Sequence, residues 1–375
     1  MQKIYLDNAA TTQLDKEVLK AMEPFFCDVF GNASSLHSFG QEASKAIEDS
    51  REKISNFLNC KPEEVIFTSG ATESNNIAIQ GIVKEGDHII TTSIEHPSVL
   101  ETCQYLEKKG MEVTYVKPQA DGIIQVKDVQ NEIKDNTVLV SIMYANNEIG
   151  TIQPIKEIGE IIKDKNIIFH TDAVQTTNYL DMDVEKLNVD LLSLSGHKIY
   201  GPKGVGVLFV KEGTKIQKIQ HGGHHEFKIR PGTLNVPGIV GLGKAIELIK
   251  ARDNEKIRKL RDYTWELIQK KINNVKLNGS LEQRLDNNLN VSIVGVEGEA
   301  LLLGFDMAGI AVSTGSACSS GSLEPSHVLM SLGLSHEESH GSLRISLGKE
   351  NTQDEIEYFV GKLLELVEKY RKMAP

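Results

Sequence analysis

Between about residues 60 and 210, short runs of β-branched and aliphatic residues alternate with segments of helical periodicity. The runs predicted to be strands are 64–68, 88–92, 111–116, 137–142, 166–169, 190–194 and 205–210. The segments predicted to be helices are 74–83, 97–109, 127–134 and 155–163. This alternation is typical of βαβ units, and it predicts an α/β fold whose central sheet is mostly parallel, with helices on both faces. Because the last two strands lie close together in sequence, we expect one antiparallel edge.

After Pro237 the pattern changes. A helical stretch runs from about 239 to 273, strand-like pieces follow at 275–277, 289–294 and 343–347, and a terminal helix is expected over 353–370. The pattern predicts a second, smaller α+β domain. We therefore expect a large domain over 13–255 and a small domain formed by 1–12 and 256–375.

Composition excludes several classes of partner. The net charge of -11 disfavours nucleic acid and anionic membrane surfaces. No apolar run approaches the ~20 residues of a membrane span, and the first residues lack the apolar core of a signal peptide. The four cysteines are widely spaced with no Cys-x-x-Cys pair, which predicts a reduced, cytoplasmic setting.

Four polar clusters follow predicted strands, and two of them suit an anion and a flat ring. Residues 68–73, which include Gly70 and Thr72, open a helix, where free N–H groups bind phosphate. Plain N-capping by Thr72 or Ser69 explains this cluster equally well. His96 follows the next strand and could stack on a ring or move a proton, although a solvent-facing loop histidine is the commoner situation.

The other two clusters supply a carboxylate and an amine. Asp172 comes just after an apolar strand, in a partly dry position where a carboxylate needs a cation or several donors, unless it is only a helix cap. Lys198 lies between a strand and a glycine-rich turn, where a partly desolvated lysine becomes a nucleophile. Most lysines are solvated surface charges, so neither residue is decisive alone.

Taken together, the clusters predict a pyridoxal 5'-phosphate (PLP) site. This cofactor needs a phosphate-binding loop, a lysine for its aldehyde, a carboxylate on its ring nitrogen and a flat group against its ring. Each requirement has a candidate at a strand end.

One cysteine, Cys318, lies in the run 313–327, which is rich in serine, glycine and alanine. Such a run predicts a mobile loop rather than a helix or strand that buries a thiol. A thiol on a flexible loop can reach a buried site and then a partner.

Several stretches resemble one family: 5–12, 31–37, 68–76, 95–97, 145–150, 170–175, 195–204 and the Cys318 loop. Through them the chain resembles the class V, fold-type I PLP enzymes, and within them the cysteine desulfurases of the NifS/IscS type. The resemblance extends from Tyr5 to about Gly348. It implies the fold-type I architecture, and it implies an enzyme that converts L-cysteine to L-alanine and a persulfide on Cys318.

The resemblance also implies roles around the cofactor. Lys198 matches the lysine that binds PLP and moves protons at the substrate Cα, and His96 matches the residue stacked on the ring. Asp172 and Gln175 match the partners of the ring nitrogen and the ring hydroxyl. The phosphate would be held by Ala71, Thr72, Ser195 and His197.

Further matches concern the substrate, the partner subunit and the acceptor. Asn147 and Arg344 match residues that hold the substrate carboxylate, with Asn32 as a further candidate. Thr233 matches a threonine that reaches the phosphate of the neighbouring subunit, which implies a homodimer. The long Cys318 loop implies transfer of sulfur to an acceptor protein, such as an iron-sulfur scaffold or a component of tRNA thiolation.

Two points stay open in the sequence. His221, His224 and His225 are close in sequence, but the glycines between them disfavour a metal site and we expect none; His336 and His340 are expected to be a surface pair. The alternative functions are a selenocysteine lyase, another class V aminotransferase, or a sulfur carrier without activity. The Cys318 loop argues against an aminotransferase, because transamination needs no thiol.

Overall fold

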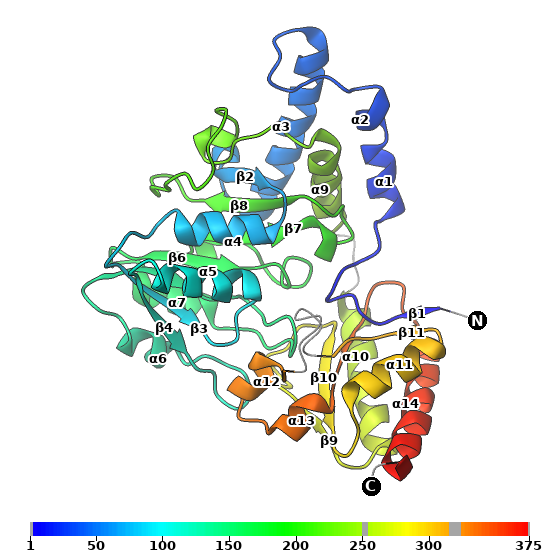
Figure 1. The fold of residues 1–375 in the computed structure, drawn as a ribbon. Coiled ribbons are helices and arrows are strands. Elements are labelled where there is room, and N and C mark those ends of the chain that lie inside the picture. The colour runs from blue at the N-terminus through cyan, green and yellow to red at the C-terminus, as the bar shows by residue number, and fades with distance from the viewer. Residues whose placement is uncertain (1–2, 250–253, 315–323, 374–375) are drawn as a thin grey trace.

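The computed structural model describes residues 3–249, 254–314 and 324–373 (Figure 1). Its largest element is a seven-stranded sheet in the order β2-β8-β7-β6-β5-β3-β4. The strands are β2 (Val65–Thr68), β3 (His88–Thr92), β4 (Glu112–Val116), β5 (Thr137–Ser141), β6 (Ile168–Asp172), β7 (Leu191–Ser195) and β8 (Gly206–Val210). Strands β4, β3, β5, β6 and β7 run parallel, as the strand-helix alternation predicts.

Helices cover both faces of this sheet because its strands are apolar on both sides. In β2, Val65 and Phe67 join the core on one face and Ile66 joins the core on the other. Helices α4 (Ala71–Gln80) and α5 (Pro97–Glu107) pack on the second face. The first face is covered by α1 (Lys16–Met22), α3 (Ser38–Leu58), α6 (Val126–Asn131), α7 (Ile155–Ile162), α8 (Val184–Leu187) and α9 (Val236–Ile249).

The predicted antiparallel strand is present, but the prediction that it forms the edge of the sheet is wrong. Strand β8 does run antiparallel to β7, but β2 pairs with the far side of β8 and forms the edge. The closeness of β7 and β8 in sequence indicates their pairing, whereas only long-range pairing with β2 sets their place in the sheet. The N-terminal helices α1, α2 (Pro24–Cys27) and α3 were not predicted from the strand-helix alternation, because they precede it.

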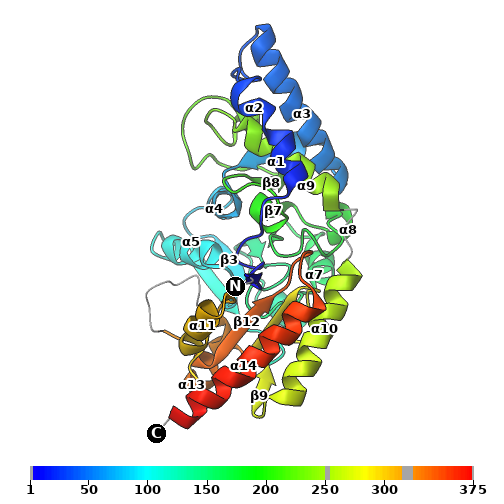
Figure 2. The same cartoon turned by 90° about the vertical axis from the view of Figure 1, so that its right-hand side faces the viewer.

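A second core lies at the other end of the molecule (Figures 1 and 2). Strands β9 (Val275–Leu277), β10 (Asn288–Ile293) and β12 (Ser342–Ser346) form a three-stranded antiparallel sheet. Helices α10 (Asn254–Lys271), α11 (Gly298–Met307) and α14 (Gln353–Met373) pack on it, and α12 (His327–Ser331) and α13 (His336–His340) complete this end. The predicted helical stretch 239–273 is represented by α9 and α10, which belong to different cores; residues 250–253 lie outside the described part.

The N-terminus belongs to this second core although it precedes the first. Strand β1 (Ile4–Tyr5) pairs in parallel with β11 (Ile310–Ala311), and Ile4 and Leu6 are buried in the second core. Beyond β1, the chain crosses to the large sheet, where Thr12 N donates to His197 O at 2.9 Å. Residues 7–12 therefore connect the two cores, and the domain division at residue 12 stays a prediction. Within the described part of the chain, no helix is long and apolar enough to cross a membrane.

Candidate active site

A cavity of about 560 Å³ lies between the two cores, where β6 and β7 end. This volume suits a small cofactor together with its substrate. Most of the predicted site residues line it: Ala71, Thr72, His96, Asn147, Asp172, Gln175, Ser195, His197, Lys198 and Arg344. Strand ends that are far apart in sequence meet here because carboxyl ends of parallel strands share one edge of a sheet.

One end of the cavity is built for an anion. Helix α4 begins after Gly70, which has a φ of 150° and gives the helix no side-chain cap. The first N–H groups of α4 are therefore open to a ligand, and Thr72, Ser195 and His197 surround them. Strand β8 can pass closely because residue 206 is a glycine: a Cβ there would lie 2.8 Å from the Cα of Gly70.

The carboxylate of Asp172 lies at the base of the cavity and is held by two donors. Its Oδ2 accepts from Nδ2 of Asn75 at 2.7 Å, and its Oδ1 accepts from the backbone N–H of Val174 at 3.0 Å. Asp172 is the last residue of β6, whereas the sequence predicted a strand that ends three residues earlier, at residue 169. Asn75 was missed, because its place on the inner face of α4 depends on how that helix packs.

Lys198 follows β7 in a short 3₁₀ turn over Gly196–Lys198. Its Nζ donates to the carbonyl oxygen of Ala9 and, at 2.8 Å, to that of Ala10. The neighbouring Gln175 donates from Nε2 to the same Ala9 oxygen at 3.1 Å. The N-terminal segment thus supplies carbonyl oxygens beside the lysine, a contribution that no local sequence signal marks.

Two histidines beside the lysine are held in the neutral state. Burial, with the positive charges of Lys198 and Lys203, lowers the pKa of His197 to about 4. Burial also lowers the pKa of His96, against the opposing charge of Asp172. His96 precedes α5, and its Nδ1 accepts from the backbone N–H of Ser98 at 3.1 Å.

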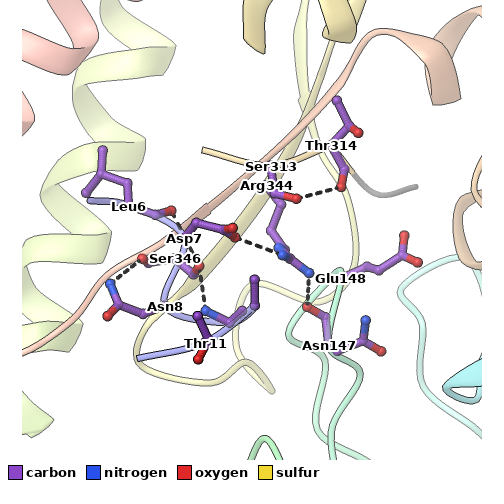
Figure 3. Close-up of polar contacts among 12 residues, drawn as sticks. Leu6, Asp7, Asn8, Thr11, Asn147, Glu148, Ser313, Thr314, Arg344 and Ser346 are labelled. Carbon is purple, nitrogen blue, oxygen red and sulfur yellow. Dashed lines mark hydrogen bonds and ion pairs between the residues drawn. The ribbon is translucent and has the colours of Figure 1, made fainter. Parts of the chain in front are cut away.

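Figure 3 shows Arg344 of β12 between Asp7 and Asn147. Its guanidinium donates to Oδ1 of Asp7 at 2.9 Å and to the carbonyl oxygen of Asn147 at 3.2 Å. The side chain is only 2 % exposed, and among the described atoms its Nε has no hydrogen-bond partner. A buried guanidinium with an unused donor at a cavity wall is suited to a carboxylate, which it can hold through two N–H groups.

The two ends of the Cys318 segment are attached beside this arginine. Ser313 and Arg344 exchange backbone hydrogen bonds at 2.7 and 3.1 Å, and Ser326 donates its hydroxyl to the buried carboxylate of Glu148 (Figure 3 shows Ser313 and Glu148). Burial raises the pKa of Glu148 to about 7, against the effects of Ser326 and Arg344. Cys318 itself lies within 315–323, outside the described residues.

Two predicted residues lie away from the cavity. Asn32 and Thr233 are exposed and do not line it. Their roles toward substrate and toward a neighbouring subunit therefore stay predictions.

The histidines that raised the question of a metal are exposed or peripheral. His221 and His224 are exposed, and His225 accepts a hydrogen bond from the backbone N–H of Gly232 at 3.3 Å. His336 and His340 are the first and last residues of α13. Among the residues that the structure describes, no group of three His, Cys, Asp or Glu side chains is arranged to hold a metal ion.

The residues present fit PLP on the chemistry of the donor set. An uncapped helix N-terminus suits the phosphate, Lys198 suits the aldehyde, and a carboxylate fixed by Asn75 and Val174 suits a protonated ring nitrogen. When bound, PLP supplies an electron sink for the bonds at the substrate Cα.

Comparison with known proteins gives the family. The profile described as "Aminotransferase class-V" matches residues 4–359. "Cysteine desulfurase IscS" of Clostridium botulinum (strain Hall / ATCC 3502 / NCTC 13319 / Type A) is 52% identical over 383 residues, covering 100% of this chain and 96% of the relative. The protein of the same description from Dictyoglomus turgidum (strain DSM 6724 / Z-1310) is 50% identical over 381 residues, covering 100% and 97%.

Solved structures agree with the sequence relatives. A structure described as "NIFS-LIKE PROTEIN" superposes with a TM-score of 0.92 at 38% identity, covering 98% of this chain and 100% of that one. Another, "SspA in complex with cysteine", gives a TM-score of 0.84 at 40% identity, covering 94% and 100%. The chain belongs to the aminotransferase class-V family and, within it, to the PLP-dependent cysteine desulfurases of the IscS and NifS type.

Proposed function

We propose that this desulfurase removes sulfur from L-cysteine by transferring it to Cys318, with the cavity residues holding the cofactor and the substrate. The observation that carries the proposal is the buried Arg344, whose Nε has no partner among the described atoms and which shares one cavity with Lys198 and Asp172. A carboxylate-binding group beside a PLP-binding group is what an amino-acid substrate requires.

Each cavity residue has a distinct task. Lys198 binds the cofactor through its amine and carries the proton at the substrate Cα, while Asp172 keeps the ring nitrogen protonated. Ala71, Thr72, Ser195 and His197 hold the phosphate, Gln175 holds the ring hydroxyl and His96 covers the ring. Arg344 and Asn147 hold the substrate carboxylate, which directs the thiol of the substrate away from them.

The sulfur step uses Cys318 as the nucleophile. Its thiolate attacks the sulfur of L-cysteine, a new S–S bond forms and the Cβ–S bond breaks, with the electron pair going to the substrate carbon. A proton added at Cβ then gives L-alanine, and the persulfide stays on Cys318. Substrate and thiol together become alanine and persulfide, so no external oxidant or reductant is needed.

We further propose that the enzyme acts as a homodimer and passes sulfur to an acceptor protein of the iron-sulfur scaffold type. Exposed Thr233 supports the dimer, since it lies outside its own cavity and is free to reach another. A cytoplasmic setting suits the thiol chemistry, because a reducing compartment keeps a nucleophilic cysteine unpaired.

Cys318→Ser tests the proposal. Serine does not ionise near neutral pH and is a poor nucleophile toward sulfur, so alanine formation from L-cysteine should fall about 100-fold or more. Cofactor content should be unchanged, and mass spectrometry should find no persulfide at residue 318. Cys27→Ser, which removes an exposed thiol, is the matched control and should keep the parental rate.

Alanine formation near the parental rate in Cys318→Ser would contradict the proposal. It would instead favour a lyase or an aminotransferase, whose reaction needs no protein thiol.

A further inference from the structure

A chain of hydrogen bonds links Asp172 to His96 beneath the cavity. Nδ2 of Asn75 donates to Oδ2 of Asp172 at 2.7 Å and to Oγ of Ser98 at 2.8 Å. Oγ of Ser98 lies 2.9 Å from Nδ1 of His96. Asn75 has no exposed surface, and its Oδ1 is buried with no partner among the described atoms.

The polarity of this chain follows from the carboxylate. Asp172 only accepts when it is ionised, so the amide of Asn75 must turn its NH₂ group toward it. The same NH₂ group then donates to Ser98, whose hydroxyl proton needs another acceptor in this buried place. Nδ1 of His96 is that acceptor, and the backbone N–H of Ser98 points at the same nitrogen at 3.1 Å. A nitrogen that receives two donors carries no proton, so the proton of neutral His96 lies on Nε2.

We propose that Asn75 is a positioning residue that ties the carboxylate of Asp172 to the tautomer of His96 through Ser98. Through these hydrogen bonds Asn75 positions both Asp172, predicted to meet the ring nitrogen, and His96, predicted to lie against the ring face. The consequence for catalysis is that His96 meets the cavity with a nitrogen that can donate a proton. This consequence rests on the proposed function, whereas the tautomer itself does not.

The charged groups around His96 agree with a neutral ring. Asp172 of β6 favours the protonated imidazole, while burial, Lys198 after β7 and His327 of α12 oppose it. Nε2 of His327 donates to the carbonyl oxygen of Glu95 at 3.0 Å. The hydrogen bonds from Ser98 therefore decide which nitrogen is protonated.

The test is ¹⁵N NMR of the histidine-labelled holoenzyme at neutral pH. The chain has 11 histidines, so a His96→Gln sample identifies the His96 signals. In the parent, the two ring nitrogens should have widely separated shifts, with Nε2 protonated. In Asn75→Ala, Ser98 loses the donor that fixes its hydroxyl, so that only the backbone N–H of Ser98 still holds Nδ1 of His96, and the two shifts should move part of the way toward each other.

Steady-state kinetics of alanine formation provide a second test. Because Asn75 does not line the cavity, KM for L-cysteine should change less than about twofold while kcat falls about fivefold, as expected for one hydrogen bond worth about 1 kcal/mol. Asn76→Ala is the matched control: Asn76 is the next residue of α4, and its Nδ2 instead donates to the carbonyl oxygen of Thr72 at 2.9 Å. It should leave both the His96 shifts and kcat at parental values.

Ser98→Ala completes the test and guards against a variant that folds poorly. It should also bring the His96 shifts together, and adding Asn75→Ala to it should change them no further. Parental His96 shifts in folded, cofactor-loaded Asn75→Ala would overturn the inference. A protein that makes no alanine from L-cysteine but keeps the predicted shifts would overturn the proposed function and leave the inference standing.

Discussion

Several side chains near the cavity are buried more deeply than their charge favours, and Glu95 is the clearest case. Its Oε1 accepts from the hydroxyl of Thr92 at 2.7 Å and from the backbone N–H of Met143 at 2.9 Å. Its Oε2 is buried and has no partner among the described atoms. Burial raises the pKa of Glu95 to about 8, and the charge of Asp172 adds to this.

This raised pKa predicts a pH-dependent stability. In the unfolded chain Glu95 loses its proton near its ordinary pKa of about 4.3, whereas the folded protein keeps it up to about pH 8. Between these values the folded state binds more protons, so stability falls as the pH rises. Glu95→Gln mimics the protonated acid and removes this loss, so its Tm relative to the parent should increase from pH 5 to pH 8.

Glu101→Gln is the matched control, because Glu101 is an exposed residue of α5. Its Tm difference from the parent should be the same at both pH values. A Tm difference for Glu95→Gln that shrinks as the pH rises would show that Glu95 is ionised in the folded protein.

At the scale of single residues, only part of the candidate site could be predicted from the sequence. Lys198, Asp172 and His96 were predicted because each lies near a strand end, which in a parallel sheet is a ligand-binding position, and the structure places all three in one cavity. Asn75 and Ser98 were missed because they lie inside helices, where sequence does not say which neighbour a polar side chain meets. The setting of Cys318 predicted a mobile loop, its nucleophilic role came from the resemblance to the family, and the residue lies outside the described part of the chain.

At the scale of elements, the segment between β8 and α9 depends on one buried ion pair. Glu226 and Arg51 of α3 lie 2.8 Å apart with side chains 1% and 3% exposed, and Glu226 also accepts from the backbone N–H of Phe67 at 2.7 Å. The same segment carries Arg230, which pairs with Glu73 of α4 at 3.0 Å. The ion pair thus fixes a segment that contacts α4, the helix at the predicted phosphate site.

Glu226→Ala should therefore be strongly destabilising, by about 3–5 kcal/mol, because it leaves the buried Arg51 guanidinium with only the exposed carboxylate of Glu48. Urea unfolding of the holoenzyme measures this change. The double variant Arg51→Met/Glu226→Leu should recover much of the loss, since no unpaired charge remains. Glu212→Ala, which breaks an exposed pair with Lys61, should have no measurable effect. Equal losses in Glu226→Ala and Glu212→Ala would contradict this assignment.

The strands of the large sheet were predicted well because they are apolar on both faces and separated by helices. The order of the strands was not predicted correctly, since β8 lies between β2 and β7 rather than at the edge. Pairing of β2 with β8 joins residues 65 and 209, and no local pattern reports a contact at that separation.

At the scale of the whole molecule, four exposed apolar side chains lie on α2, on α3 and in the segment between them. Phe26, Phe30, Leu36 and Phe39, here called the N-terminal apolar patch, are 57%, 68%, 91% and 54% exposed. The rings of Phe30 and Phe39 lie 5.7 Å apart. Clustered exposed apolar groups of this kind are typical of a protein interface, which supports the proposed homodimer.

Replacing Phe30, Leu36 and Phe39 together by serine should therefore shift the protein from dimer to monomer in analytical ultracentrifugation. Cofactor affinity should fall as well, because Thr233 of a neighbouring subunit would be lost from the site. The control replaces Leu303 and Met307 of α11, which are 70% and 82% exposed, and should remain dimeric. A triple variant that stays dimeric would exclude the patch from the interface.

The connection that residues 7–12 make between the two cores has a consequence for how the protein is made. Ile4 pairs with Ile310 and Asp7 with Ser346. The first strand therefore cannot form its native pairing until more than 300 further residues have been synthesised. At ribosomal rates of about 5–20 residues per second, that wait is on the order of 15–60 s. All strands of the large sheet, with Lys198 and Asp172, have been synthesised long before Arg344 emerges. The residues predicted to hold the cofactor are therefore all synthesised before Arg344, so the predicted carboxylate site is the last part of the cavity to be completed.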